Sequence, residues 1–352
     1  MKIERLVKNP PQWLSASGPE SGNVLSSRVR LARNFREKKF THLLTPSEKK
    51  EQLEKVSGKM LEEKLFKNPF FFDLEVEKPV VRNVLVERHI ISFDLANSGG
   101  ARGCLVSGSE KSGVMINEED HLRMQVIMSG FQLKEAFREA EELDKKTAGL
   151  FDYAFSERFG YLTACPTNVG TGLRASVLVH LPALVLTRSI SKVFNGILKI
   201  GFSVRGFYGE GTEALGNIFQ ISNQNTLGKN EDTIVDMIDR ITVQLLNYEK
   251  DARDFLMKDA RVKTEDTVYR ALGILENART LSSREFMEHF SSIKLGASLG
   301  FFKSLKIQDL NEMLVLAQVG HLQKLNGCEM DETERDFVRA RMVRETLKYT
   351  GE

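Results

Sequence analysis

The chain has 352 residues, a length that accommodates about two domains, each with a hydrophobic core of its own. Hydrophobic residues make up 41% and charged residues 28% of the chain, a balance typical of soluble globular proteins. Lys and Arg total 50 against 48 Asp and Glu, and the net charge of +2 gives no general attraction to nucleic acid or to a membrane surface.

Targeting signals and cysteine pairs are missing from the sequence. The N-terminal segment MKIERLVKNPPQWL lacks the apolar run of a signal peptide, and the longest apolar stretch, 175–186, is too short to span a bilayer. Cys104, Cys165 and Cys328 are odd in number, lie far apart and form no C-x-x-C pair. We therefore expect a cytoplasmic protein without a disulfide framework or a cysteine-based zinc site.

The first predicted helix begins after residue 45, and the segment before it is irregular except for a strand-like stretch at 26–35. Thr45 can serve as the N-cap, Pro46 occupies the first helical position, and Glu48 completes a capping box. The apolar residues that follow keep helical spacing up to the break at 68–69, and they are Leu53, Val56, Met60 and Leu61.

From about 83 to 117 the pattern changes to short β-rich runs. The first run is NVLVERHIISF, and the two later ones, CLV and VMIN, flank a Gly- and Ser-rich turn and predict a hairpin. A helix is predicted at 131–147, and further strands are predicted at 159–164, 201–205 and 217–222, with helices between them.

After about residue 230 the β signals disappear. Residues 230–259 form one amphipathic pattern, and helical patterns continue to the end of the chain. The sequence therefore predicts an α+β fold for the first two-thirds and an all-α fold for the last third, with a boundary near 225–260.

Arginines in unusual positions are the first functional signal, because the common phosphate-binding loop G-x-x-x-x-G-K-[ST] and the kinase motifs H-R-D and D-F-G are absent. Arg28 and Arg30 alternate on the predicted strand, so both point to one face. Arg123, Arg174 and Arg205 lie at predicted strand ends or loop mouths. A single exposed arginine is usually a solvent contact. Several that converge could hold a triphosphate without a phosphate-binding loop.

Carboxylates accompany the arginines. Glu118, Glu119 and Asp120 end an apolar strand, and Glu210 lies in the Gly-rich turn GEGTE at 209–213. An acidic run of this kind is often only a solvated loop. Two carboxylates that face a pocket of arginines would instead suit a planar cationic substrate.

Four long segments resemble a known family. SSRVRLAR, INEEDHLR, GYLTACPTNVGTGLRA and RGFYGEGTEALGNIFQISN are similar, in this order, to the catalytic segments of the ATP:guanido phosphotransferases, the creatine and arginine kinase superfamily. The likeness covers about residues 21–250, and over the whole chain it is greatest to bacterial protein-arginine kinases. It implies a guanido-kinase catalytic domain at 1–250, with an antiparallel sheet flanked by helices, and a smaller all-α C-terminal domain at 251–352.

The resemblance also implies a role for each site residue. Glu119 and Glu210 would grip the substrate guanidinium, Glu119 would accept its proton, Cys165 would orient it, and Asn168 would shape the loop near the phosphates. With no metal ligands from the protein itself, Mg²⁺ would bridge the phosphates of ATP, which would be bound by Arg28, Arg30, Arg123, Arg174 and Arg205.

The adenine site departs from one branch of the family. ARGCLV at 101–106 resembles the segment that supplies a stacking histidine in creatine kinases, and the matching position here is Val106. We therefore expect apolar contacts to hold the adenine.

A second site is implied near the C-terminus. RDFVRA at 335–340 places Arg335, Asp336 and Arg339 on a predicted helix, where the two arginines are i,i+4 neighbours on one face. Taken alone, the pattern is a solvated basic stripe. By resemblance to the protein-arginine kinases it marks an allosteric site for phosphorylated arginine, whose dianionic phosphate suits a doubly basic face.

Two alternatives differ in substrate and in chemistry. Phosphagen kinases that act on free arginine resemble this chain only after a helical lid domain, for which SSRVR, beginning at Ser26, leaves no room. A non-catalytic adaptor that binds phosphoarginine would be expected to have lost Glu119, Glu210 or the arginines, which are all present. A protein substrate is therefore expected, and the resemblance to the protein-arginine kinases implies a stress-response role.

The resemblance also implies partners: arginine-bearing protein substrates, a zinc-binding activator protein, a Clp-type protease, a heat-shock repressor and a second copy of the chain in a homo-oligomer. No nucleic-acid or membrane partner is expected.

Overall fold

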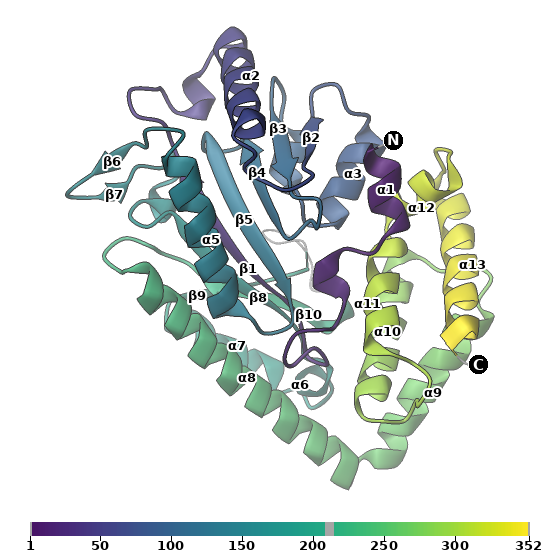
Figure 1. The fold of residues 1–352 in the computed structure, drawn as a ribbon. Coiled ribbons are helices and arrows are strands. Elements are labelled where there is room, and N and C mark those ends of the chain that lie inside the picture. The colour runs from purple at the N-terminus through teal and green to yellow at the C-terminus, as the bar shows by residue number, and fades with distance from the viewer. Residues whose placement is uncertain (1, 208–214, 351–352) are drawn as a thin grey trace.

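An antiparallel sheet runs through the computed structural model, which describes residues 2–207 and 215–350 (Figure 1). Its eight strands follow the order β2-β3-β4-β5-β1-β8-β10-β9. The strands are β1 (Val24–Arg33), β2 (Phe70–Asp73), β3 (Gly103–Val106), β4 (Ser112–Ile116), β5 (Leu122–Ser129), β8 (Leu173–His180), β9 (Phe202–Arg205) and β10 (Ile218–Asn223). A separate pair joins β6 (Phe155–Ser156) to β7 (Gly160–Tyr161).

Helices flank the sheet and make up all regular structure after residue 230. They are α1 (Lys2–Lys8), α2 (Pro46–Glu62), α3 (Pro79–Glu87), α4 (Phe93–Asn97), α5 (Leu133–Ala148), α6 (Pro182–Leu186), α7 (Ile190–Lys199), α8 (Glu231–Asp259), α9 (Arg261–Asn277), α10 (Ser283–Ser298), α11 (Ile307–Leu316), α12 (Val319–Asn326) and α13 (Glu332–Thr350). The predicted α+β fold followed by an all-α region is confirmed.

One face of the sheet is apolar. Strand side chains alternate between faces, so Val29 and Leu31 of β1 point to the side opposite Arg28 and Arg30. They join Val126 and other buried residues in a core covered by α5 and α8, which cross the sheet in Figure 1. This face contributes hydrophobic stabilisation, since full burial of one Val or Leu contributes about 1.5–3 kcal/mol.

The other face of the sheet is apolar toward one end of its strands and carries the arginines toward the other end. Toward one end of the strands it carries Ile127, Leu178 and Ile218, which pack with Phe286 and Leu314 of the C-terminal helices in a second buried core. Toward the other end it carries the arginines. The C-terminal helical region is therefore packed directly beside the arginine-bearing part of the sheet.

Local signals predicted several elements correctly. Thr45 Oγ1 accepts a hydrogen bond from the Glu48 amide at 3.2 Å, and the Thr45 amide donates to Glu48 Oε2 at 2.7 Å, so the predicted capping box starts α2. The β3–β4 hairpin, α5 and the long helix α8 are also confirmed.

Three predictions about local structure were wrong. The run at 83–93 is not a strand, because Pro79 starts a helix, α3, that buries Val81, Val84 and Leu85 at helical spacing. The segment at 2–8, predicted as irregular, is helix α1. The stretch between the strands predicted at 159–164 and 201–205, where helices were expected, contains strand β8, and Arg174 lies in this strand.

A buried lysine in the C-terminal core generates a stability prediction. Lys294 of α10 is fully buried, and its Nζ donates to Asn311 Oδ1 at 2.7 Å. Burial, and to a lesser extent the charge of Arg253, lower the pKa of Lys294 to about 7. Between pH 7 and about 10 the unfolded chain therefore holds a proton that the folded protein has released. The unfolding free energy should rise with pH over this window, by at most about 1.4 kcal/mol per pH unit.

We predict that Lys294→Met removes this rise. Urea unfolding of the parent protein and of Lys294→Met at pH 7, 8 and 9 measures their unfolding free energies. Other titrating groups contribute equally to both proteins, so the difference in unfolding free energy at each pH reports on Lys294 alone. Parallel pH dependences in the two proteins would contradict the prediction.

Candidate active site

The arginine-bearing end of the sheet forms the floor of a cavity of about 1080 Å³. The structure brings together in its lining all the predicted catalytic-site residues that it describes, which are Arg28, Arg30, Arg123, Arg174, Arg205, Glu119, Cys165 and Asn168. Glu210 lies outside the described residues. Arg335, Asp336 and Arg339 lie in α13, away from this cavity.

Strand register explains why the arginines converge. Arg30 of β1 is paired with Arg174 on β8 and with Gln125 on β5, and directly paired residues of an antiparallel sheet share a face. Arg205 of β9 is paired with Gln220 of β10, on the same face. A one-residue shift of β1 would turn its arginines into the apolar core.

The glycine-containing loop before β8 is held tightly against β1. Gly172 has a φ of +63°, and a Cβ placed there would lie 2.5 Å from the carbonyl oxygen of Ala32. Only glycine fits this approach without a shift of the backbone. The close contact allows β8 to pair with β1 from Leu173 onward and so places Arg174 in the cavity.

The guanidinium groups of Arg28 and Arg30 are crowded by positive charge. Burial, followed by the charge of Arg123, lowers the pKa of Arg28 to about 9. Burial and the charges of Arg28 and Arg123 hold the pKa of Arg30 well below its usual range. The buried Nε of Arg30 has no hydrogen-bond partner among the described residues. These groups form an electropositive site whose charge and donors suit a bound polyanion.

Arg123 is neutralised, in contrast to its neighbours. Its Nη1 lies 2.5 Å from Glu118 Oε2, and Ser92 Oγ donates to the other oxygen of Glu118 at 2.5 Å. Although burial alone would raise it, the charge of Arg123 lowers the pKa of Glu118. Glu118 is therefore an anchor for Arg123 and is unavailable to a cationic substrate.

The two neighbouring carboxylates differ from Glu118 and from each other. Asp120 is buried and accepts hydrogen bonds from Asn34 Nδ2 at 2.6 Å and from the Ala164 amide at 2.7 Å, so it fixes the loop that precedes Cys165. Glu119 is exposed in the cavity, and Asn168 Nδ2 donates to its Oε2 at 3.3 Å. Partial burial and the charge of Asp120 raise the pKa of Glu119. A carboxylate with a raised pKa that faces a cavity is suited to accept a proton.

Cys165 and Asn168 flank a short turn at the cavity rim. Residues Pro166–Asn168 form a three-residue 3-10 turn. Cys165 is half-buried, and its Sγ lies 3.1 Å from Thr167 Oγ1. Thr226 Oγ1 donates to the carbonyl oxygens of Thr167 and Val169 at 3.1 and 2.7 Å, which ties the turn to the segment after β10.

Sequence analysis missed other residues that line the cavity. His89, Ser92 and Phe93 come from the segment that was predicted as a strand, so their approach to the arginines was not foreseen. Gln125, which contacts Arg28, was detectable, because it follows Arg123 by two residues on β5 and so shares its face.

The apolar side chains of the cavity come from a segment other than 101–106. Val106 is fully buried in the core between β3 and α3, and it does not line the cavity. The apolar side chains of the lining are Val86, Ile91 and Phe93.

The C-terminal residues are less exposed than a solvated basic stripe would be. Arg339 is 1% exposed, and its guanidinium donates to the carbonyl oxygens of Ala317 and Leu281 at 2.9 and 2.6 Å and to Asp336 Oδ1 at 2.5 Å. Arg335 is half-buried and donates to the Met330 carbonyl oxygen at 2.9 Å. Arg339 therefore fixes Asp336, and Arg335 is the more accessible of the two arginines.

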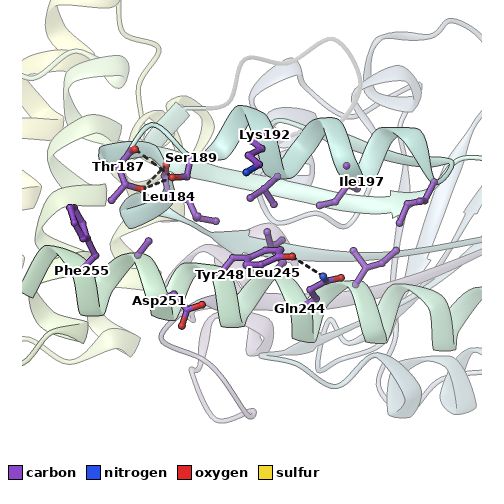
Figure 2. A pocket seen from close by; sticks show the side chains of 15 residues that line it. Leu184, Thr187, Ser189, Lys192, Ile197, Gln244, Leu245, Tyr248, Asp251 and Phe255 are labelled. Carbon is purple, nitrogen blue, oxygen red and sulfur yellow. Dashed lines mark hydrogen bonds between the residues drawn. The ribbon is translucent and has the colours of Figure 1, made fainter.

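A second large cavity has a different character. It measures about 780 Å³ and lies between α7 and α8, where Figure 2 shows Leu184, Ile197 and Phe255 projecting from its walls. Its charged side chains are Lys192 and Asp251. It does not combine several arginines with a carboxylate, so the arginine cavity is the candidate active site.

The described residues contain neither a metal-binding cluster nor a membrane-spanning helix. Within 2–207 and 215–350, no group of three or more His, Cys, Asp or Glu side chains could hold a metal ion. No helix in the same part of the chain is both long and apolar enough to cross a bilayer.

Comparison with known proteins identifies two families. Residues 49–252 match the ATP:guanido phosphotransferase C-terminal catalytic domain, and residues 261–352 match the protein-arginine kinase McsB C-terminal domain. A protein-arginine kinase of Bacillus pumilus (strain SAFR-032) is 45% identical over 351 residues, which span 99% of this chain and 96% of that protein. The protein-arginine kinase of Bacillus subtilis (strain 168) is 45% identical over 350 residues, with coverage of 99% and 96%.

Solved structures share the fold. Lombricine kinase has a TM-score of 0.56 at 24% identity, over 69% of this chain and 71% of that one. The duplicated taurocyamine kinase from Schistosoma mansoni with bound transition state analog components has a TM-score of 0.60 at 24% identity, over 69% of this chain and 35% of that one. The predicted guanido-kinase fold is confirmed.

The crowding of the arginines generates a prediction about anion binding. Inorganic triphosphate should raise the melting temperature of the protein, by about 4 °C at roughly 100 times its Kd, where binding contributes about 2.7 kcal/mol. Arg30→Met should raise the melting temperature of the ligand-free protein, because it removes a buried and repelled charge, and should shrink the triphosphate effect.

Thermal-shift titrations of both proteins test this, with Arg138→Met as a control because Arg138 is 69% exposed on α5. If triphosphate raised the melting temperature of Arg30→Met as much as that of the parent, Arg30 would not be part of the anion-binding site.

Proposed function

We propose that this chain, which belongs to the protein-arginine kinases of the ATP:guanido phosphotransferase family, transfers the γ-phosphoryl group of ATP to arginine side chains of proteins. One observation supports this most strongly. A single cavity holds Arg28 and Arg30, which form no ion pair among the described residues, together with two exposed carboxylates that no cation of the described residues pairs. These are Asp94 and Glu119, and only Glu119 lies in the motif that resembles the family. Phosphoryl transfer to a guanidinium needs such arginines and such a carboxylate side by side.

The arginines are assigned to the nucleotide phosphates. Arg28, Arg30 and Arg174 lie on the central strands β1 and β8. Arg123 and Arg205 lie on strands to either side, so the five side chains can contact successive phosphates of a nucleotide bound over this face of the sheet. The Nε of Arg30, which has no hydrogen-bond partner within residues 2–207 and 215–350, is a donor that a phosphate oxygen would satisfy.

The remaining lining fits the rest of Mg-ATP. Val86, Ile91 and Phe93 offer apolar contacts to the adenine ring. ATP supplies the phosphoryl group. Mg²⁺, which the family typically uses, would arrive with the nucleotide and would offset negative charge on its phosphates.

Glu119 is assigned to the substrate guanidinium, and Glu210 to the same role by its motif alone, since it lies outside the described residues. As the new P–N bond forms and the γ-phosphorus separates from the bridging oxygen of ADP, one guanidinium proton passes to the Glu119 carboxylate. Full deprotonation of a guanidinium with a pKa of about 13.8 at pH 7 would cost about 9 kcal/mol, so transfer concerted with bond formation avoids a free neutral guanidine.

Neighbouring groups hold this arrangement. Asn168 donates to Glu119 and keeps its carboxylate directed into the cavity, and Glu118 holds Arg123 in place. Cys165, at the rim, is assigned to orienting the guanidinium.

We assign Arg335, Asp336 and Arg339 to an allosteric phosphoarginine site, on the RDFVRA resemblance. The burial of these three side chains supports a division of roles within this proposal. Arg335 would contact the phosphate, Asp336, whose side chain is 21% exposed, would contact the guanidinium, and the buried Arg339 would hold Asp336.

The wider assignments rest on resemblance as well. We propose a catalytic domain at 1–250 and a helical domain at 251–352, a cytoplasmic location and a homo-oligomer. We also propose a zinc-binding activator protein as a partner, and downstream effects through a Clp-type protease and a heat-shock repressor.

The proton acceptor generates the next prediction. Glu119→Gln should lower kcat by about two to four orders of magnitude and leave the affinity for ATP unchanged, because the amide keeps the shape but accepts no proton. Glu118→Gln is the matched control, since it should weaken ATP binding through Arg123 and spare kcat. In the parent enzyme kcat should fall as acid protonates Glu119, at a pH above the usual range for a glutamate because its pKa is raised.

Acid-labile phosphate on an arginine-rich protein measures this turnover. Near-normal kcat in Glu119→Gln would exclude Glu119 as the base.

The C-terminal site generates another prediction. In a Glu119→Gln background, Arg335→Ala should weaken binding of free phosphoarginine about tenfold or more, as expected for one lost charge-assisted contact. Arg339→Ala should instead lower the melting temperature, because it removes donors from two buried carbonyl oxygens.

Calorimetry with phosphoarginine, with Arg341→Ala as an exposed control on the same helix, separates these effects. Equal affinities of Arg335→Ala and its parent for phosphoarginine would show that Arg335 does not bind this ligand.

A further inference from the structure

We infer that Gln125 is a positioning residue for the phosphate-binding Arg28, and that a contact between α3 and α12 links this positioning to the C-terminal helices. The inference rests on the proposed function in one respect, namely that Arg28 binds a phosphate of ATP. Three sets of contacts carry it.

The first is a clamp on the Arg28 guanidinium. Gln125 is 2% exposed, and its Oε1 accepts from Arg28 Nε at 3.1 Å and from Nη2 at 2.5 Å. No carboxylate in the described part of the chain pairs with Arg28, so an uncharged acceptor holds it without cancelling its charge. An arginine held in this way stays positive toward a phosphate and fixed in direction.

The second set ties Gln125 to the turn after α3. Its Nε2 donates to the carbonyl oxygens of His89 and Ile90 at 2.8 and 3.0 Å. The Gln125 side chain therefore uses both its oxygen and its nitrogen, and it cannot rotate without losing these hydrogen bonds. A shift of the 89–90 backbone would therefore displace the Gln125 side chain, and with it the Arg28 guanidinium.

The turn itself is tightly constrained. His89 has a φ of +57°, a left-handed conformation that is uncommon for a non-glycine residue. Its ring lies between Trp13 and Phe207, with centroid distances of 5.0 and 5.1 Å. Arg88 is 1% exposed and forms two 2.6 Å hydrogen bonds to Glu110. The turn is thus a rigid link and not a flexible loop.

The third set joins the same turn to α12. The buried carboxylate of Glu87 accepts from the Gly320 and His321 amides at 2.6 and 3.0 Å and from His321 Nδ1 at 2.7 Å. It therefore caps the N-terminus of α12, where a carboxylate is favoured. The opposite nitrogen of His321 lies 3.3 Å from Arg88 Nη1.

At Gly320 the two helices are in close contact. A Cβ placed on it would lie 2.8 Å from the Val84 backbone nitrogen and 2.9 Å from Glu87 Oε2. Helix α12 belongs to the segment that matches the protein-arginine kinase C-terminal domain. Successive buried hydrogen bonds therefore connect this domain to Arg28, through α12, Glu87, the 88–90 turn and Gln125.

A change in the C-terminal helices that moves α12 would reach Arg28 along this path. Gly320 itself lines neither cavity, so a substitution there acts on ATP only at a distance. Gly320 is therefore the position at which a substitution tests the coupling between α12 and Arg28 most directly.

The experiment measures ATP affinity by calorimetry, together with KM for ATP, KM for an arginine-rich protein and the melting temperature, in the full chain. Gln125→Met should weaken ATP binding about tenfold, as expected when a charged group loses its hydrogen-bond acceptor. Gly320→Ala should raise KM for ATP several-fold and leave KM for the protein substrate unchanged. Gly273→Ala is the matched control, because a Cβ at this helical glycine of α9 meets nothing within 4 Å.

A double-mutant cycle separates positioning from simple destabilisation. On an Arg28→Met background, neither Gln125→Met nor Gly320→Ala should weaken ATP binding further. Additive losses would overturn the link, and so would a lower melting temperature with unchanged ATP affinity. If Gly320→Ala fails to fold, Glu87→Gln weakens the same cap without added bulk, and an unchanged KM for ATP in this variant would count against the link.

Failure of the proposed function has a different signature. Unchanged ATP affinity in Arg28→Met would overturn the assignment of Arg28 to the phosphates, and the link with it. Lost affinity in Arg28→Met together with normal affinity in Gln125→Met and Gly320→Ala would overturn the link alone.

Discussion

Guanidinium groups gathered on one face of a sheet repel one another. The geometry of the whole site depends on the hydrogen bonds and ion pairs that hold these groups in place against this repulsion. Burial and mutual repulsion lower the pKa of Arg28 and Arg30. Glu118 neutralises Arg123, whereas Gln125 satisfies Arg28 without neutralising it. The site is therefore held in place and keeps an excess of positive charge, which a polyphosphate can match.

The same strands supply the stability that this arrangement needs. Along β1, Arg28 and Arg30 alternate with Val29 and Leu31, which are buried against α5 and α8. The part of the arginine face that does not form the cavity packs on the C-terminal helices. Catalytic cavity and C-terminal region are thus neighbours on one surface of one sheet, so the position of either constrains the other.

Sequence patterns predicted the parts of the structure that depend on local chemistry. The capping box of α2 needs only Thr45 and Glu48, and the shared face of Arg28 and Arg30 needs only strand alternation. Helix α3 was missed because its Val- and Leu-rich run suits a buried strand or a buried helix equally well. The contact between Gln125 and the 89–90 turn and the burial of Arg339 depend on residues distant in the sequence, which no local pattern encodes.

The acidic run shows how tertiary contacts assign chemistry that composition leaves open. Glu118, Glu119 and Asp120 are adjacent and chemically similar, yet each has a different partner. Ser92 and Arg123 occupy the first, the Asn34 side chain and a backbone amide bind the third, and only a weak contact from the Asn168 side chain reaches the second. A carboxylate that is to accept a proton from a substrate must be free of tight partners within the protein, and of these three Glu119 alone meets this condition, which supports the role proposed for it.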